Sequence, residues 1–179
     1  IFKNMTQTIF LAGGCFWCTE AVFLSLKGVL EANPVYLGGN TSDPKYEDIC
    51  TGQTGHAEAI QCIFDENKIR LSKILEIFFK THNPTELNRQ GNDVGTQYRS
   101  EIFIVDNSQL KVAEQSIVDA EKLWEAKVHT KVTMINKFYP AEDYHKNYYL
   151  KNTQATYCKF IIKPKINFLE KNFKNLLKN

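Results

Sequence analysis

The sequence has no long apolar run, no strong net charge and no internal repeat. None of its apolar stretches approaches the roughly 20 residues of a membrane-spanning helix, so we expect no membrane segment. A net charge of +2 gives no reason to expect nucleic acid or an acidic membrane surface as a partner. The first residues, IFKNMTQ, lack the apolar core of a signal peptide, which favours a cytoplasmic protein. The chain does not begin with Met, so the removal of an N-terminal address is left open.

Cysteine is too sparse for a secreted disulfide framework. Such frameworks are shorter, denser and even in cysteine count, whereas this chain has five cysteines in 179 residues. They are Cys15, Cys18, Cys50, Cys62 and Cys158. A zinc site at Cys15 and Cys18 would need a second ligand pair, and the spacing of Cys50 and Cys62 is wrong for one. Catalytic, redox or simply buried thiols are the favoured interpretations, and no metal is expected.

The patterns that are present predict one α+β domain. Short apolar runs predict strands at 8–12, 29–37 (broken by Pro34), 59–64, 101–105 and 132–136. Helical spacing predicts helices at 15–27, 72–82 (with Ser72 as its cap), 108–127 and, amphipathic, about 165–178. Strands and helices alternate without a regular βα repeat. We therefore expect helices packed on a mixed, mostly antiparallel sheet.

The stretch AGGCFWCTEAVF, residues 12–23, places a cysteine between a glycine turn and the first turn of a helix. Backbone N–H groups and the helix dipole favour a thiolate at such a position. Cys15 is therefore a candidate nucleophile. The alternatives are that Cys15 and Cys18 are small buried hydrophobes, or that their CxxC spacing marks a thioredoxin-like disulfide oxidoreductase.

Two more segments are not explained by packing. In TGQTGHAEAIQCIF, residues 51–64, Glu58 stands at the entrance of an apolar strand, with His56 just upstream. If Glu58 points inward, desolvation raises its pKa and lets it donate a proton near neutral pH; the alternative is a solvent-facing glutamate.

In NRQGNDVGTQYRS, residues 88–100, a long polar loop is either functional or a surface turn. Asp93 and Tyr98 are its residues best suited to orienting a polar ligand group.

Together these segments resemble the A-type peptide methionine sulfoxide reductases. The similarity runs from about Thr8 to about Pro164, and its motifs occur in the family's order and spacing. They are GCFW (14–17), GG followed by PKY (38–46), GxTGHAE (52–58), NRQGNDxGTQYRS (88–100) and YPAEDYHKNYY (139–149). The resemblance implies a two-layer α/β roll related to the ferredoxin-like sandwich. It also implies one domain spanning 1–179, with a catalytic core at about 8–164 and a C-terminal helix at about 165–178, working as a monomer.

The family's activity supplies expected roles for single residues. The resemblance implies an enzyme that reduces the S epimer of methionine sulfoxide, free or in proteins, without a cofactor and with thioredoxin as reductant. By position, Cys15 matches the nucleophile and Glu58 the acid. The substrate-binding positions are Phe16 and Trp17 around the methyl group, and Tyr46, Asp93 and Tyr98 around the sulfoxide oxygen. Tyr46 follows Asp-Pro-Lys and has no signal of its own beyond ordinary turn chemistry.

The resemblance also implies a resolving cysteine, because the sulfenic acid formed on Cys15 must react with a thiol. Cys158, in NTQATYCKF, lies where many members carry that cysteine, and we favour it as the first resolver. Cys18 is a departure, since the best-known pattern has glycine there. Because residues i and i+3 share one side of a helix, Cys18 is an alternative resolver or the next site of the disulfide. Cys50 and Cys62 are expected to be structural.

Overall fold

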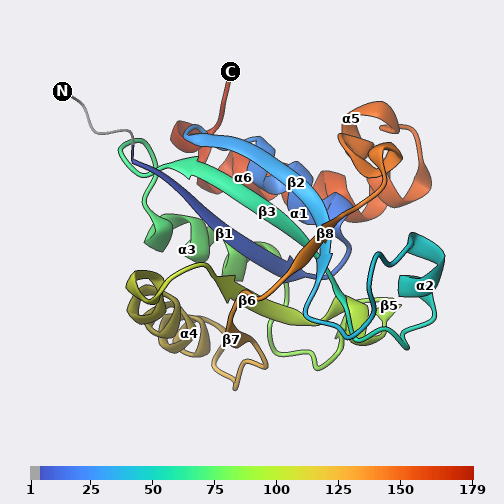
Figure 1. Ribbon diagram of the computed structural model, residues 1–179. Helices are drawn as coiled ribbons and strands as arrows, with labels where there is room; N and C mark the ends of the chain where they lie inside the picture. Colours follow the sequence, from blue (N-terminus) through green and yellow to red (C-terminus); the bar gives the residue numbers. More distant parts are fainter. Residues whose placement is uncertain (1–4) are drawn as a thin grey trace.

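A curled six-stranded sheet forms the centre of the molecule (Figure 1). The computed structural model describes residues 5–179. Residues 1–4, part of the IFKNMTQ segment considered above, lie outside the described residues. The strand order is β7-β6-β1-β3-β2-β8, with β6 and β7 parallel and all other neighbours antiparallel. The strands are β1 (Thr6–Gly13), β2 (Val29–Leu37), β3 (Ala57–Asp65), β6 (Ser100–Ile104), β7 (Lys131–Met134) and β8 (Phe138–Pro140).

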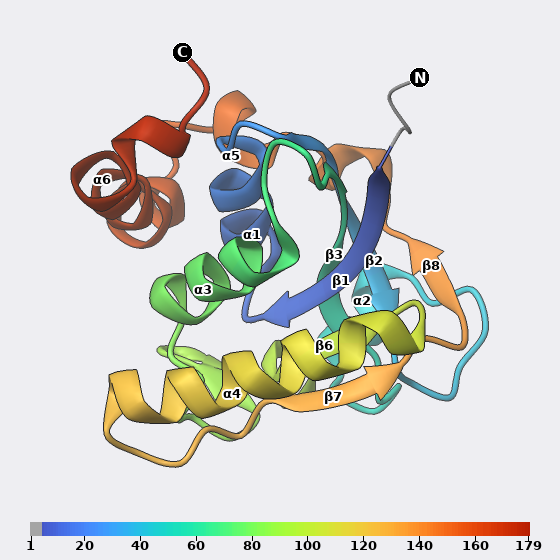
Figure 2. The same cartoon turned by 90° about the vertical axis from the view of Figure 1, so that its left-hand side faces the viewer.

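Three helices cover one face of this sheet, namely α1 (Phe16–Leu24), α3 (Leu71–Thr81) and α4 (Leu110–Trp124). A fourth, α6 (Lys163–Asn172), packs against α1 on the side away from the strands (Figure 2). The central strand order β6-β1-β3-β2, with α1 between β1 and β2 and α3 between β3 and β6, is the ferredoxin-like arrangement. The predicted α+β class with a mixed, mostly antiparallel sheet is confirmed.

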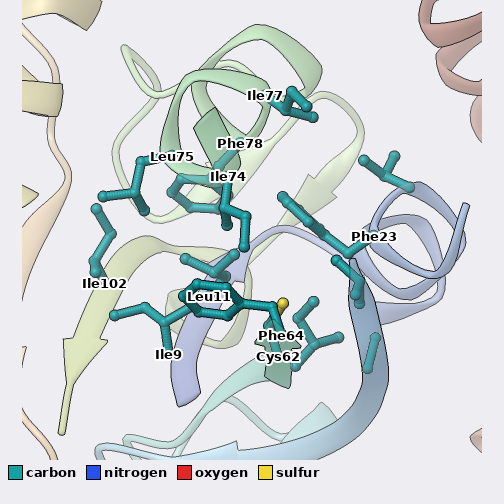
Figure 3. Packing of buried hydrophobic residues seen from close by; sticks show 14 of the residues in the cluster. Ile9, Leu11, Phe23, Cys62, Phe64, Ile74, Leu75, Ile77, Phe78 and Ile102 are labelled. Carbon is teal, nitrogen blue, oxygen red and sulfur yellow. The ribbon is translucent and has the colours of Figure 1, made fainter. Parts of the chain in front are cut away.

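Alternation along the strands divides the apolar side chains between two clusters. Ile9 and Leu11 of β1 face the helices and belong to the main core, where they meet Phe23 of α1 and Phe78 of α3 (Figure 3). The intervening residues of β1 form a smaller cluster on the other sheet face. Cys62 of β3 is fully buried in the main core, as expected of a structural cysteine.

Two local predictions are wrong. Ser72 does not cap α3, because the helix begins one residue earlier with Arg70 at the N-cap position. Pro34 does not break its strand, and β2 runs through it from Val29 to Leu37. The Pro34 carbonyl accepts a hydrogen bond from Ala141 N–H at 3.0 Å, just beyond the last residue of β8. An N–H at position 34 would point to the same side of β2 as this carbonyl, where β8 has already ended. The lack of an N–H in proline therefore removes no hydrogen bond between strands.

Several short elements surround the edge where β1 ends and α1 begins. They are α2 (Tyr46–Cys50), the β4–β5 ribbon (Arg89–Gln90 and Asp93–Val94), α5 (Tyr148–Lys151), 3₁₀ turns at Thr96–Tyr98 and Asp143–His145, and a π-helical turn at Cys158–Ile162. Two further 3₁₀ turns lie at the opposite edge of the sheet. Asn107–Gln109 contacts the start of β1 through Gln109, and Lys174–Leu176 accepts the N–H of Lys27 just before β2. Within residues 5–179, no helix has the length and apolarity needed to cross a membrane.

Candidate active site

Cys15 lies at the N-cap position of α1, as predicted, directly after the glycine pair that ends β1. Both glycines are required, Gly13 by a close side-chain neighbour and Gly14 by its backbone conformation. A side chain on Gly13 would meet the Phe78 ring at 2.8 Å, and Gly14 has a φ of +90°, which L residues rarely adopt. The tight turn leaves the Cys15 thiol almost buried, with 8% of the residue exposed.

Glu58 reaches the same turn from β3. The Phe16 N–H donates a hydrogen bond to Glu58 Oε1 at 3.2 Å, and only 2% of the residue is exposed. Burial raises the pKa of the Glu58 carboxyl to about 8; the negative charge of Asp93 acts in the same direction, and the Phe16 N–H opposes it. The carboxyl is therefore mostly protonated at neutral pH and able to donate its proton, which agrees with the inward orientation considered from the sequence.

Cys15 and Cys18 lie in one buried cluster, each changes the pKa of the other, and all five cysteines are free thiols. The pKa of Cys15 is raised well above the ordinary thiol value by burial, then by the interaction with Cys18 and by the charge of Glu58. The pKa of Cys18 is lowered, first by the interaction with Cys15, and the Lys165 ammonium lowers it further. The expectation that the helix start favours a thiolate on Cys15 is wrong for the reduced protein, because burial outweighs the backbone contribution.

Phe16 and Trp17 form an aromatic wall beside Cys15. Phe16 is fully buried, and its ring lies 4.9 Å from the His145 ring, centroid to centroid. The Trp17 indole N–H donates a hydrogen bond to His145 Nδ1 at 2.9 Å, and the indole stacks on Tyr148 at 3.6 Å with an interplanar angle of 6°. Sequence reasoning assigned no role to His145 or Tyr148, although both lie in the YPAEDYHKNYY motif.

Tyr46, Asp93 and Tyr98 come from three different elements and converge around Glu58, close enough for their charges to interact. Tyr46 begins α2, and its N–H donates to Glu142 at 3.0 Å. Burial raises the pKa of both tyrosine hydroxyls above the ordinary value, and the charge of Glu58 adds to this. Both hydroxyls therefore remain protonated and can donate hydrogen bonds.

Cys158 is fully buried at the start of the π-helical turn, in one cluster with Cys15 and Cys18. The preceding residue, Tyr157, places its hydroxyl 3.5 Å from Cys18 Sγ and donates a hydrogen bond to Asp93 at 2.8 Å. The structure thus brings together all nine residues selected from the sequence, and it adds Tyr157, which had no signal other than its position before Cys158. Among residues 5–179, no group of three or more His, Cys, Asp or Glu side chains is arranged to hold a metal ion.

Comparison with known proteins gives a consistent result. Residues 7–177 match the family model described as peptide methionine sulfoxide reductase. The chain is 48% identical to peptide methionine sulfoxide reductase MsrA of Acinetobacter baumannii, over 98% of this chain and all of that protein. Reduced Mxr1 of Saccharomyces cerevisiae superposes with a TM-score of 0.81 at 33% identity, over 86% of this chain and 90% of that one. Mxr1 in complex with Trx2 gives a TM-score of 0.58 at 25% identity, over 80% and 85% of the two chains.

The family match covers nearly the whole chain and includes every residue of the site described above. The fold, the buried acid beside the cysteine and the extent of the match lead to the same assignment. This chain belongs to the peptide methionine sulfoxide reductase family.

Proposed function

We propose that the chain reduces methionine-S-sulfoxide, free or in proteins, to methionine, and so repairs oxidative damage. The observation that carries the proposal is Glu58, a buried and protonated carboxyl held beside Cys15 through the Phe16 amide. A sulfoxide oxygen is a poor leaving group until it is protonated. An acid of this kind next to a thiol therefore suits sulfoxide reduction better than simple disulfide exchange.

In the first step, the Cys15 sulfur attacks the sulfoxide sulfur and gives up its thiol proton, while Glu58 gives its own proton to the oxygen. Tyr46 and Tyr98 stabilise the charge that develops on that oxygen, and Asp93 orients the polar network. Collapse of the adduct transfers the hydroxyl to Cys15, so methionine leaves and Cys15 becomes a sulfenic acid. The substrate sulfur gains two electrons, and the Cys15 sulfur loses them.

The aromatic wall supports a preference for one epimer. Phe16 is fixed by full burial, and Trp17 is fixed by its hydrogen bond to His145 and its stack on Tyr148. A methyl group packed against these rings would orient the sulfur so that its oxygen points toward Glu58. The opposite epimer would then place its oxygen away from the acid.

A second thiol then attacks the Cys15 sulfenic acid, which releases water and leaves a disulfide. Clustering of Cys15, Cys18 and Cys158 supports an intramolecular step, with Cys158 as first resolver and Cys18 as the alternative. Thioredoxin is the proposed reductant of this disulfide. The structural likeness to Mxr1 crystallised with Trx2 supports that choice. The monomeric state, the compartment and the domain limits stay predictions.

The experiment that tests the function is a turnover assay with the two epimers of methionine sulfoxide and a dithiol. We expect the wild type to convert the S epimer only, Cys15→Ser to be inactive, and Cys62→Ala, which alters a core thiol away from the site, to remain active. Insulin disulfide reduction should be weak. Strong insulin reduction without sulfoxide turnover would instead identify a thioredoxin-like disulfide oxidoreductase.

A further inference from the structure

Lys165 is a lysine of α6 that points into the protein. Helix α6 lies beside α1 on the helical face (Figure 2). The Lys165 ammonium donates a hydrogen bond to the carbonyl of Thr81, the last residue of α3. Burial lowers the pKa of Lys165, and the charges of Cys18 and Cys15 oppose that change. Lys165 is half-buried, and its ammonium carries three donors, so one backbone partner leaves it capacity for further bonds.

Lys165 and Cys18 line the same small cavity between α1, α3 and α6. The cavity has a volume of about 10 Å³, and its other lining residues are Gly13, Thr19, Val22, Phe78, Thr81 and His82. A space of this size holds no more than about one water molecule, so the charge of Lys165 acts on Cys18 with little screening. Burial lowers the pKa of His82 to about 3, so His82 is neutral and adds no charge there.

The charged groups around the two thiols differ. Glu58, once ionised, raises the pKa of Cys15, whereas Lys165 lowers the pKa of Cys18 and is opposed there by Asp93. Tyr157 has a single hydroxyl proton, and its short bond to Asp93 at 2.8 Å competes with the 3.5 Å contact to Cys18. Among the described residues, Lys165 is thus the cation that acts on Cys18, and Cys158 nearby is a thiol whose pKa burial raises.

We propose that Lys165 holds Cys18 as a thiolate in the reduced protein, and that this thiolate is the base that takes the Cys15 proton during attack on the sulfoxide. The second half rests on the proposed function. As the Cys15 sulfur bonds to the sulfoxide sulfur, its proton passes to Cys18, the neighbouring thiolate of the same buried cluster, and Glu58 gives its own proton to the oxygen. Cys18 gains one proton and Glu58 loses one, so a later return of that proton through solvent restores both groups. Lys165 is a positioning residue in this scheme, because it touches no reacting atom.

The thiolate can be measured without substrate, through the absorbance of the reduced protein at 240 nm as pH is raised from 5 to 10. We expect a thiolate in the wild type that titrates below the ordinary thiol range and is missing in Cys18→Ser. Lys165→Met should move this titration up by about one pH unit or more, which is roughly a tenfold loss of thiolate near neutral pH. Lys165→Arg should keep it low, and Lys163→Met, an exposed lysine of the same helix, should not change it.

A purely structural role for Lys165, as a cap on α3, would lower the melting temperature of Lys165→Met without moving the titration, and that outcome overturns the proposal. A low titration that persists in Cys18→Ser also overturns the proposal.

The base role is tested separately by single-turnover reduction. Lys165→Met should slow this reduction about tenfold at pH 7, and the difference from the wild type should shrink as pH rises. An unchanged rate despite a shifted titration refutes the base role. A shifted titration in a protein that reduces no sulfoxide would refute the proposed function and leave the Lys165–Cys18 pair intact.

Discussion

At the scale of single residues, local sequence predicts positions better than it predicts charge. Cys15 between a glycine pair and a helix was identifiable from neighbouring residues and lies where that pattern places it. For Glu58 the neighbouring residues left the inward and solvent-facing orientations open, and only the family resemblance selected it as the acid; its side chain points inward. The opposite pKa shifts of Cys15 and Cys18 were not identifiable, because they depend on burial and, for Cys18, on Lys165 from the far end of the chain. Tyr46 had no local signal, since its role depends on where α2 packs.

In the proposed mechanism the protonated form of Glu58 is the active form, so the rate of sulfoxide reduction should depend on pH in a defined direction. The proton is present below a pKa of about 8 and absent above it, so the single-turnover rate should fall as pH rises through that value. Glu58→Gln should slow this step by about 10²- to 10⁴-fold, the usual contribution of a general acid, and should lose the alkaline decline. Rapid-quench measurement of methionine formation over pH 6–10 would check both.

Two controls separate the acid role from a general disturbance of the site. Cys15 should remain alkylatable in Glu58→Gln, and Glu31→Gln, an exposed carboxylate on the neighbouring strand β2, should behave as wild type. A single-turnover rate in Glu58→Gln equal to that of the wild type would remove Glu58 from the mechanism.

At the scale of elements, hydrophobic periodicity was sufficient for the long strands and helices and insufficient for the short ones. The four-residue helix α5 is too short to be stable alone. It is held by Glu20 of α1, a buried side chain that accepts the N–H of Asn147 at 3.0 Å. Asn147 itself has a φ of 56°, a left-handed conformation. This link places Tyr148 on Trp17, and no periodic pattern predicts it, because it depends on a contact between distant segments.

The π-helical turn at Cys158–Ile162 is the element on which the proposed disulfide route depends. Such turns are irregular and often functional, and this one starts at a thiol already clustered with Cys15. A bond between Cys15 and Cys18 would instead have to close within the first turn of α1, which a regular helix disfavours. After one oxidising turnover, peptide-mapping mass spectrometry should therefore find mainly a Cys15–Cys158 disulfide in the wild type. In Cys158→Ser it should find a Cys15–Cys18 disulfide.

The matching control is Cys18→Ser, in which the Cys15–Cys158 bond should still form. Exclusive formation of the Cys15–Cys18 bond in the wild type would assign the resolving role to Cys18 and leave Cys158 without one.

At the scale of the whole molecule, the fold class could be predicted and the strand order could not. Composition and alternating patterns indicate an α+β domain, but pairing of β1 with both β3 and β6 joins segments far apart in the chain. The same long-range packing buries two glutamates that a sequence would place at the surface. Burial raises the pKa of Glu20 to about 7 and that of Glu58 to about 8. The active site is therefore built at a cost in folding stability that grows with pH.

That cost gives a prediction for the unfolding free energy. The unfolded chain releases the Glu58 proton near the ordinary value of 4.5, whereas the folded protein keeps it to about pH 8. Between these values unfolding releases a proton, so this group lowers stability as pH rises, by on the order of 1 kcal/mol per pH unit. Glu20 acts in the same direction up to about pH 7, and neutral buried His82, with its pKa lowered to about 3, acts oppositely below 6.5. The contributions of Glu20 and His82 are the same in Glu58→Gln and in the wild type, so they cancel in the difference between the two unfolding free energies.

Urea unfolding under reducing conditions should therefore show that the unfolding free energy of Glu58→Gln rises relative to that of the wild type from pH 5 to pH 8. Any destabilisation by the new amide is independent of pH and does not affect this trend. Glu114→Gln, an exposed carboxylate on α4, should show no such trend. A difference that stays constant with pH would mean that Glu58 is ionised in the folded protein across this range. Since an ionised Glu58 could not protonate the sulfoxide oxygen, this equilibrium measurement tests the acid role without any turnover.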